Sequence, residues 1–453
     1  MLKRLFKFPT QLFKNIAPRQ GTREHNIIPR EKHPISRKNI SPSALKVMRH
    51  LHEANFDAVL VGGGVRDLLL GSNPKDFDIA TDATPEQVKR LFRSARIIGR
   101  RFRIVHVRFG REVIEVTTFR AHHESAQNNH EAASSDIGML TRDNVYGDIQ
   151  SDAARRDFTV NALYYSTNGF SIHDYAGGMQ DIDKRIVRMI GNPETRYKED
   201  PVRMLRAVRF AAKLSFTIEP TTAKPIKPLS ELLQHVPPAR LFEEVLKLFM
   251  GGHAAPTLRL LHEYRLLEHL FPATAAALDS GDPYAKKLIE LAMHNTDKRI
   301  RNHKRVTPAF IYAALLWPAL RQEKQRLIEK NISPLPAIQQ AGQQIVNQQL
   351  LHTSIPKRFL IPMREIWDLQ LRLTRRYGKS AERLSQHPRF RAAYDFILLR
   401  EEAGEDLNGL GQWWTQYQNV SPEERQHMVA QLGSQRPKRP RRRRRKQQVP
   451  TAP

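Results

Sequence analysis

The 453-residue chain contains no cysteine, which excludes disulfides, thiolate metal sites and cysteine nucleophiles. It also lacks any run of 18 or more apolar residues, the length needed for a membrane-spanning helix. Its first residues have no continuous apolar stretch followed by a small-residue cleavage site, so a secretory signal is not indicated. From these absences we expect a protein without a transmembrane segment, located in the cytoplasm.

Acidic residues are scarce at both ends of the chain. Residues 1–40 contain ten Lys/Arg and two Glu, a net charge of +8, and residues 433–453 contain nine Lys/Arg and no acid, a net charge of +9. Because the whole chain carries +28, the region between them still holds +11. This pattern is typical of proteins that bind polyanions. We expect a basic N-terminal arm over 1–40 and a disordered polybasic tail over 433–453 that binds phosphates without sequence specificity.

A glycine-rich turn follows an apolar segment in the first quarter of the chain. Residues 58–61 (Ala-Val-Leu-Val) predict a buried strand, and residues 62–64 (Gly-Gly-Gly) follow it directly, before a helix expected to start near Val65. The bare amides of glycine can approach a phosphate closely. Arg66 adds planar donors that suit a triphosphate, although it could equally pair with Asp67.

Asp76 and Asp78 form a pair of carboxylates spaced i, i+2. If residues 76–81 are extended, the two side chains project from one face, with Cα atoms about 6–7 Å apart. Such a pair repels itself unless a cation lies between, and carboxylate oxygens suit Mg²⁺, which completes its shell with water and substrate phosphates. The alternative is a solvated surface pair. The sequence therefore predicts a phosphate cradle and a metal site in one unit, whose solvated carboxylates contribute little to stability.

Two serine or threonine residues that precede proline predict the starts of helices. Ser41 caps a helix expected over 42–54 and marks the start of order, and Thr84 opens a capping box for a helix over 85–93. Two strands near 103–109 and 113–119 then form a predicted hairpin beside the Asp-Phe-Asp strand. Within it, Glu115 lies among apolar residues and predicts a buried carboxylate with a metal or arginine partner, or else an edge-strand residue facing water.

The next stretch, residues 121–143, is polar and aperiodic, which predicts an irregular loop near the site. Its histidines lack the spacing of a zinc site. Residues 152–161 (Asp-Ala-Ala-Arg-Arg-Asp-Phe-Thr-Val-Asn) predict a short helix or turn leading into a strand. Arg155 and Arg156 have the character of nucleotide contacts, and Asp157 is able to accept a ribose hydroxyl or join the metal site. A local Asp–Arg salt-bridge cluster is the alternative.

Four motifs, in order, resemble those of the class II nucleotidyltransferases of the polymerase β superfamily. They are Gly-Gly-Gly-Val-Arg-Asp, Asp-Phe-Asp, Arg-Arg-Asp-Phe-Thr-Val-Asn-Ala and Glu-Asp-Pro-Val-Arg-Met-Leu-Arg-Ala-Val-Arg-Phe, and the resemblance covers residues 42 to about 250. It implies an α+β fold with a small mixed-sheet nucleotidyltransferase head over 41–190. An all-helical neck over 191–250, which recognises the base, and an RNA-binding body and tail over 251–432 would follow. The helical periodicity from about residue 201 independently favours this half.

The resemblance also implies roles for individual residues. Asp76 and Asp78 become the metal-binding catalytic pair, and Gly63, Gly64 and Arg66 lie where the family holds the triphosphate. Glu115 and Asp157 are both candidates for the third catalytic carboxylate. The further nucleotide contacts implied are Arg155, Arg156, Asn161, Glu199, Asp200 and Arg203, of which the last three recognise the base. Asp200 followed by proline is also a favourable helix start.

Two branches of this superfamily are similar in these motifs, and one further stretch separates them. Residues 97–106 (Ile-Ile-Gly-Arg-Arg-Phe-Arg-Ile-Val-His) and the polybasic tail resemble bacterial poly(A) polymerases. The implied activity is template-independent transfer of adenylate from ATP to RNA 3′ ends with release of pyrophosphate, serving RNA tailing, processing and decay. Mg²⁺ is the implied cofactor, with Mn²⁺ as the alternative, and ATP is the substrate. The alternative activity is that of a CCA-adding tRNA nucleotidyltransferase.

Partners follow from the same resemblance and from the charge distribution. We expect a monomer that binds RNA 3′ ends and ATP, with RNA-decay proteins docking on the basic tails. A non-catalytic RNA-binding adaptor is a competing hypothesis, but such a protein would be expected to lose one of the two aspartates or the glycine turn, and both are present. Nucleotide transfer to a small-molecule hydroxyl would not explain the long basic helical half.

Overall fold

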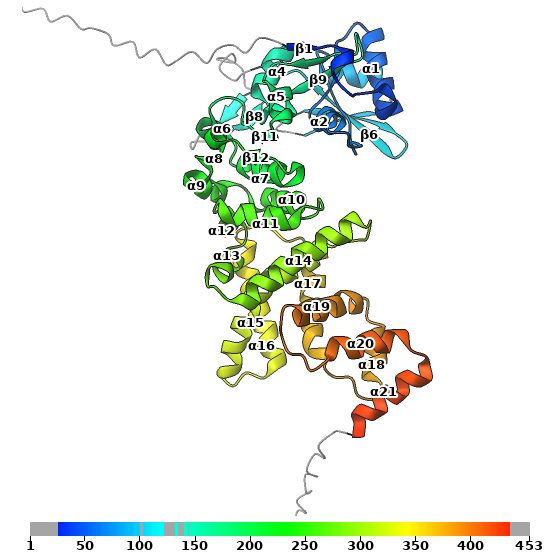
Figure 1. Ribbon diagram of the computed structural model, residues 1–453, viewed down its shortest axis with the longest axis vertical. Coiled ribbons are helices and arrows are strands. Elements are labelled where there is room, and N and C mark those ends of the chain that lie inside the picture. The colour runs from blue at the N-terminus through cyan, green and yellow to red at the C-terminus, as the bar shows by residue number, and fades with distance from the viewer. Residues whose placement is uncertain (1–25, 100–102, 122–131, 135–139, 144, 435–453) are drawn as a thin grey trace, which may run out of the picture. The chain divides into compact units, whose positions relative to one another are not determined.

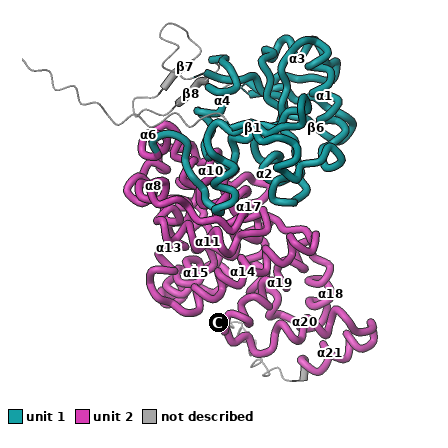
Figure 2. Tube along the Cα trace, turned by 45° about the horizontal axis from the view of Figure 1, so that its top comes forward, with its two compact units in different colours: residues 1–192 teal, residues 193–453 magenta. Residues whose placement is uncertain are grey.

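The computed structural model describes residues 26–99, 103–121, 132–134, 140–143 and 145–434 (Figure 1). The chain divides into two compact units, residues 1–192 and residues 193–453 (Figure 2). Within the described ranges, no helix combines the length and the apolar character that crossing a bilayer requires. The polybasic tail, except for two residues of the last helix, and residues 1–25 of the basic arm lie outside the described residues.

The first unit contains the strands of the molecule's main sheet and five short helices. Its strands are β1 (Asn26–Ile28), β2 (Ala58–Val61), β3 (Asp78–Thr81), β4 (Ala95–Ile98), β5 (Ile104–Phe109), β6 (Glu112–Thr118), β7 (Ala132–Ser134), β8 (Leu140–Asp143), β9 (Leu163–Ser166), β10 (Ile172–Asp174) and β11 (Ile186–Val187). Its α-helices are α1 (Pro42–Glu53), α2 (Gly63–Leu69), α3 (Pro85–Leu91), α4 (Ile149–Arg155) and α5 (Gly178–Asp183), with 3₁₀ turns at 30–32, 37–39 and 159–161.

Eight described strands form one mixed sheet in the order β1-β10-β9-β2-β3-β6-β5-β4. Only β3 and β6 run parallel within it, and every other neighbouring pair is antiparallel. The apolar run of β2 is buried along its whole length, as expected for a central strand. The predicted mixed-sheet head and the hairpin of β5 and β6 are confirmed, and this topology puts the hairpin directly beside β3.

The predicted helix caps are present in the structure. The Ser41 hydroxyl accepts hydrogen bonds from the amides of the first turn of α1, and Thr84 and Gln87 form the reciprocal capping box of α3. The apolar face of α1, including Val47 and Leu51, is fully buried, and α1 packs against β2, β3 and β6. These caps and this packing fix the positions of the central strands β3 and β6, which carry Asp78 and Glu115.

Three expectations about the first unit are corrected. Residues before Ser41 are already ordered, because β1 pairs with β10 and the side chains of Ile35 and Ile40 are buried, each contributing about 2 kcal/mol. β4 was not expected, yet it forms one edge of the sheet. The stretch 121–143 is not wholly irregular, since β7 and β8 form a separate two-stranded sheet. Its histidines lie outside the described residues.

The second unit, as far as it is described (residues 193–434), is helical apart from one two-residue strand. Its elements are α6 (Pro193–Glu199), α7 (Val202–Leu214), β12 (Thr217–Ile218), α8 (Pro220–Ala223), α9 (Ile226–Leu229), a 3₁₀ turn at 230–235, α10 (Pro238–Phe249), α11 (Ala254–Glu263), α12 (Leu267–Leu270), α13 (Pro272–Asp279), α14 (Pro283–Arg301), α15 (Pro308–Glu329), α16 (Pro334–Leu350), α17 (Lys357–Arg372), α18 (Ser380–Ser385), α19 (Phe390–Glu402), α20 (Leu410–Asn419) and α21 (Pro422–Ser434).

Helix α15 is the centre of this second unit and packs against α13, α14, α16 and α17. The unit's core contains three fully buried tryptophans, and the indole NH of Trp367 donates to the carbonyl of Ala313 on α15 at 3.1 Å. The indole NH of Trp414 likewise donates to the carbonyl of Leu373 at 3.1 Å. Large buried side chains with satisfied polar groups favour one packing arrangement of these helices. The expected helical neck, body and tail are therefore confirmed as a fold class.

Candidate active site

The glycine turn connects β2 to α2 and brings its backbone close to the acidic residues. Gly62 has φ +76°, in the region that favours glycine, and a Cβ there would lie 3.7 Å from Arg156 Nη1 and 3.8 Å from Asp78 Oδ2. A Cβ on Gly64 would lie 3.4 Å from the carbonyl oxygen of Asp76. The sequence indicated Gly63 and Gly64, but the positive φ identifies Gly62 as the position where glycine is needed for the turn.

Asp78 and Glu115 lie side by side at the start of the parallel strand pair of the main sheet. They are direct register partners on β3 and β6. Asp76 belongs to the irregular segment just before β3, so the strand is shorter than expected. The pKa of Asp78 is raised from 3.8 to about 6, mainly by burial and then by the negative charge of Glu115, with Asp76 adding to the rise and Arg156 opposing it. Three carboxylates therefore act on one another here.

Glu115 differs from the expectation of a buried carboxylate. Its side chain is 45% exposed, and Oε1 lies 3.1 Å from Nε2 of His106 on the neighbouring strand β5. Because β6 lies between β3 and β5, the edge-strand alternative is wrong as well. Glu115 thus projects from a central strand toward solvent, with an imidazole on one side and Asp78 on the other.

Arg156 belongs to a buried polar cluster close to these carboxylates. Its guanidinium donates to Asp152 Oδ2 at 2.9–3.0 Å and to the hydroxyl of Tyr164 at 2.9 Å, and that hydroxyl donates to Asp152 at 2.7 Å. Asp152 is only 6% exposed. The salt-bridge alternative therefore describes Arg156 correctly, and its positive charge also acts on Asp78. Arg155 ends α4 and is partly buried.

Arg66, Asn161 and Asp157 form a second cluster next to the glycine turn. The Arg66 side chain is 2% exposed and donates to the side-chain oxygen of Asn161 and, at 2.6 and 2.9 Å, to Asp67. The Asn161 amide in turn donates to Asp157 at 3.1 Å, and Asp157 accepts the backbone NH of Phe158 at 2.8 Å. The sequence expected Arg66 to face a triphosphate, whereas these contacts tie it to Asp67 and Asn161.

The residues implied to recognise the base lie in the second unit and form ion pairs there. Glu199 accepts from Arg196 at 2.9 Å and from Arg203 at 2.7 Å. Asp200 accepts from Arg240 on α10 at 2.7 Å and from the backbone NH of Val202 at 3.3 Å. Asp200 therefore accepts from an NH at the start of α7, but the helix begins at Val202 with Pro201 as its N-cap, one residue later than the expected start. Arg240 was missed, because only the packing of α10 against α7 brings it to Asp200.

Together, Asp76, Asp78 and Glu115 have the donor chemistry of a magnesium site. Carboxylates whose mutual repulsion raises the pKa of one of them are stabilised by a hard cation. Mg²⁺ typically takes one or two protein carboxylates and completes its octahedral shell with water and substrate phosphates. Among the described residues, no three acidic or histidine side chains converge into a ready-made metal cage. Asp76 and Asp78 therefore fit the ion as partial ligands that need a substrate to complete the shell.

Solved structures place this fold in a class. The crystal structure of the Bacillus stearothermophilus CCA-adding enzyme in complex with CTP matches with a TM-score of 0.56 at 26% identity, covering 87% of this chain and 84% of that chain. A tRNA nucleotidyltransferase complexed with a primer tRNA and an incoming ATP analog shares the fold, with a TM-score of 0.53 at 21% identity and coverage of 82% and 98%. The chain is a nucleotidyltransferase with the polymerase β type of catalytic head.

Sequence relatives identify the family within that class. The chain matches the Poly A polymerase head domain over residues 58–188, a probable RNA and SrmB-binding site of polymerase A over 215–278 and the polymerase A arginine-rich C-terminus over 330–448. It is 51% identical to poly(A) polymerase I of Salmonella typhimurium, over 90% of this chain and 88% of that protein, and 44% identical to that of Haemophilus influenzae, over 92% and 93%. The chain belongs to the poly(A) polymerase I family and is a polynucleotide adenylyltransferase.

The CCA-adding enzymes are more distant relatives in sequence. That of Bacillus subtilis is 39% identical over 227 residues, which is 50% of this chain and 55% of that protein. The similarity to poly(A) polymerases I thus covers about 90% of the chain and includes most of the helical half. The stretch matched by this CCA-adding enzyme, by contrast, spans only half of the chain. The expected assignment to the poly(A) polymerase branch is confirmed.

Proposed function

We propose that the enzyme transfers adenylate from ATP to RNA 3′ ends by a metal-assisted in-line attack at the carboxylates of the paired strands β3 and β6. The observation that carries this proposal is the juxtaposition of Asp78 and Glu115 in register, with Asp76 beside them and the pKa of Asp78 raised to about 6. Bound Mg²⁺, or Mn²⁺ as the alternative, would lower the pKa of the attacking 3′-hydroxyl and neutralise charge on the leaving pyrophosphate.

The chain's own residues supply position and charge. Asp76 and Asp78 hold the metal, and Glu115, opposite Asp78, is our choice for the third carboxylate, because Asp157 is engaged with Asn161 in the other cluster. The amides that begin α2 at Gly63 and Gly64 would hold the triphosphate. Arg66 positions Asn161, and Asn161 and Asp157 present the polar groups that suit a ribose.

The direct test is extension of a short labelled RNA that has no tRNA features, supplied with each nucleoside triphosphate in turn and Mg²⁺. We expect long ladders with ATP alone. Addition of two C residues and one A, restricted to tRNA supplied with CTP and ATP, would instead establish the CCA-adding reaction. No incorporation from any of the four triphosphates would contradict both activities.

Base selection is expected to depend on the cluster at the start of α7. A carboxylate accepts from the adenine amino group and a guanidinium donates to its ring nitrogen, so Glu199 or Asp200 with Arg203 is a suitable pair for adenine. Replacing Arg203 with alanine should raise the KM for ATP and reduce the preference for ATP over CTP, each by roughly 10- to 100-fold. Steady-state kinetics with both triphosphates checks this.

The matched control for that variant is Lys198→Ala, which removes an exposed positive charge five residues earlier in the chain, paired only with Glu194 at 2.6 Å. It should leave both KM and the preference unchanged. An Arg203→Ala enzyme with wild-type discrimination would show that the cluster only stabilises the start of α7.

The cellular setting completes the proposal. We propose that the enzyme works in the cytoplasm as a monomer in RNA tailing, processing and decay, and that RNA-decay proteins dock on its basic tails. The support is the charge of residues 1–40 and 433–453, which attracts both RNA and acidic protein surfaces.

A further inference from the structure

A cavity of about 530 Å³ lies within the second unit, where the C-terminal end of α14, the start of α15, α17 and α19 meet. Its volume is within the roughly 300–1,000 Å³ typical of ligand sites. Two partly buried aromatic rings, Phe310 and Phe359, line it together with Ile366 and two prolines. The cavity therefore offers flat apolar ring surfaces that are partly exposed to solvent.

Five arginines line the same cavity, which we call the arginine pocket. They are Arg299, Arg305, Arg358, Arg389 and Arg391, and the acidic lining residues are Asp395 and Glu402. Because Glu365, outside the lining, also binds Arg389 at 3.1 Å, a surplus of two positive charges remains. Asp395 binds Arg391 at 3.0 Å and Arg299 at 3.4 Å. Within the described part of the chain no ion pair engages the exposed side chains of Arg305 and Arg358, and the Arg358 guanidinium lies 4.9 Å from the centre of the Phe359 ring.

The end of α14 explains only part of this surplus. Cations near a helix C-terminus are favoured by the helix dipole, which accounts for Lys298, Arg299 and Arg301. It does not account for Arg305, which follows the helix, or for the arginines contributed by α17 and by the start of α19. The first turn of α15, a helix of 22 residues, also begins at the pocket and adds the positive end of its own dipole.

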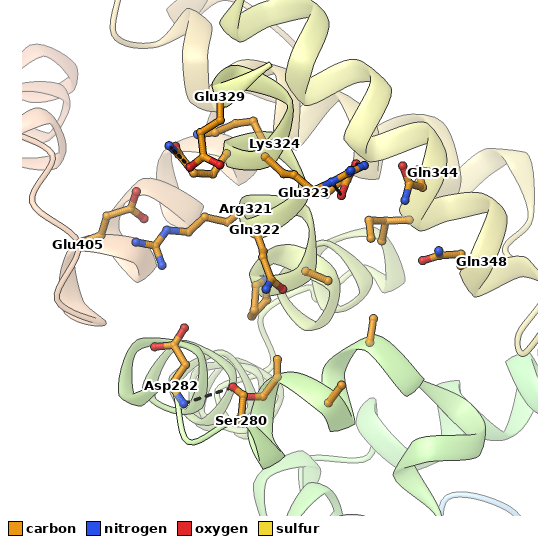
Figure 3. A pocket seen from close by; sticks show the side chains of 18 residues that line it. Ser280, Asp282, Arg321, Gln322, Glu323, Lys324, Glu329, Gln344, Gln348 and Glu405 are labelled. Carbon is orange, nitrogen blue, oxygen red and sulfur yellow. Dashed lines mark hydrogen bonds and ion pairs between the residues drawn. The ribbon is translucent and has the colours of Figure 1, made fainter. Parts of the chain in front are cut away.

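The larger cavity of the same unit shows that such a surplus is not general. That cavity, of about 1220 Å³, is lined by three basic residues and four acidic ones (Figure 3). Figure 3 shows Glu323 and Glu329 on α15 among its basic residues, and Arg326 binds Glu323 at 2.6 Å. The positive net charge of the chain therefore does not by itself give every cavity a basic lining. The excess of basic residues is specific to the arginine pocket.

We propose that the arginine pocket binds an internal nucleotide of single-stranded RNA, with a base stacked on the Phe359 side and phosphates held by Arg305 and Arg358. Aromatic rings with arginines over or beside them form the stacking platform and the cationic groove that sequence-tolerant binding of single strands requires. The nucleotide is an internal one because the 3′ end reacts in the first unit. This inference rests on the proposed function and locates part of its RNA path.

Binding of a non-extendable RNA tests the pocket separately from catalysis. The probe is a fluorescent 3′-deoxy oligoadenylate about 20 nucleotides long, long enough to occupy a single-strand site. The variant Arg305→Gln/Arg358→Gln should bind it about tenfold more weakly, and the slope of log K against log salt should fall by about 1.4 because two phosphate contacts are lost. Phe359→Leu should weaken binding about tenfold with the slope unchanged.

The control variant is Lys286→Gln/Lys287→Gln, which removes the same charge from exposed positions at the other end of α14. It should retain the wild-type dissociation constant and slope. If the control weakens binding as much as the pocket variant, or if the pocket variant binds like the wild type, the proposal is overturned, and in the second case the pocket serves a partner other than RNA. Melting curves establish folding, and Arg305→Gln alone replaces the double variant if that one is unstable.

Kinetics separate this inference from the proposed function. With saturating RNA, the pocket variant should incorporate adenylate at the wild-type kcat and show an increased KM for RNA only. A wild-type enzyme that binds the probe but incorporates no adenylate would contradict the proposed function and leave the binding result intact. A pocket variant with a reduced kcat and an unchanged KM would contradict the inference and leave the function intact.

Discussion

Replacing Asp78 with asparagine should reduce adenylate transfer by roughly 10³-fold or more and, in metal-free buffer above pH 6, make the first unit more stable. The loss of activity follows because the metal site loses a ligand worth several kcal/mol of transition-state stabilisation. The gain in stability follows because the folded protein holds the Asp78 carboxylate in an unfavourable place, where burial and the charges of Glu115 and Asp76 raise its pKa from 3.8 to about 6.

The sign of the pH dependence follows from proton linkage. Between pH 3.8 and about 6 the folded state keeps a proton on Asp78 that the unfolded state has lost, so the free energy of unfolding decreases as pH rises through this window. Above it, the penalty is complete and on the order of 3 kcal/mol. Asparagine does not ionise, so the advantage of the variant should be absent near pH 4 and complete above pH 7.

Urea unfolding at several pH values measures this effect, with amide hydrogen exchange in the first unit as the readout. Asp82→Asn is the control, because Asp82 is exposed at the end of β3 and should gain no pH-dependent stability and keep activity. Mg²⁺ should stabilise the wild type and leave Asp78→Asn unchanged. Near-wild-type tailing by the variant would show that Asp78 is not a metal ligand. Equal stability of the two proteins at pH 8 would show that the ionised Asp78 carboxylate does not destabilise the fold.

The sequence predicted the local parts of the catalytic unit well. The helix starts at Ser41 and Thr84, the buried strand β2 and the hairpin beside β3 depend on neighbouring residues, and short-range rules describe them. The sequence could not predict the environment of Asp78. Its parallel pairing with Glu115 joins residues that are far apart in the chain, so a carboxylate expected to be solvated is in fact partly buried beside another.

The missed features share this long-range origin. β1 is three residues long and becomes a strand only because β10 offers an edge. Arg240 reaches Asp200 only through the packing of α10 on α7. The arginine pocket combines side chains from several separate elements, each of which looks like ordinary surface charge in the sequence. Patterns of neighbouring residues therefore predict elements and motifs, and tertiary packing decides which charges meet.

Replacing Arg156 with methionine should destabilise the first unit by about 3–5 kcal/mol, because the buried Asp152 carboxylate loses the guanidinium that forms its ion pair. After the change, Asp152 still accepts from the Tyr164 hydroxyl and the backbone NH of Arg120, and the positive charge of the Arg120 side chain still acts on it. Activity should fall as well, since the positive charge of Arg156 lowers the pKa of Asp78 and its loss favours the protonated form that cannot bind a metal.

A double-mutant cycle with Asp152→Asn shows whether the buried pair is responsible. The variant Arg156→Met/Asp152→Asn should be more stable than Arg156→Met alone, because asparagine carries no charge to leave unpaired.

All four tryptophans lie at or beyond residue 317, so their fluorescence reports the second unit and should not change, whereas hydrogen exchange in the first unit should accelerate. Lys184→Met, at an exposed position of the first unit, should change its stability by less than about 0.5 kcal/mol. Equal destabilisation by Arg156→Met and by the double variant would mean that the guanidinium acts through packing on Tyr164, whose ring centre lies 5.2 Å away, and not through its charge.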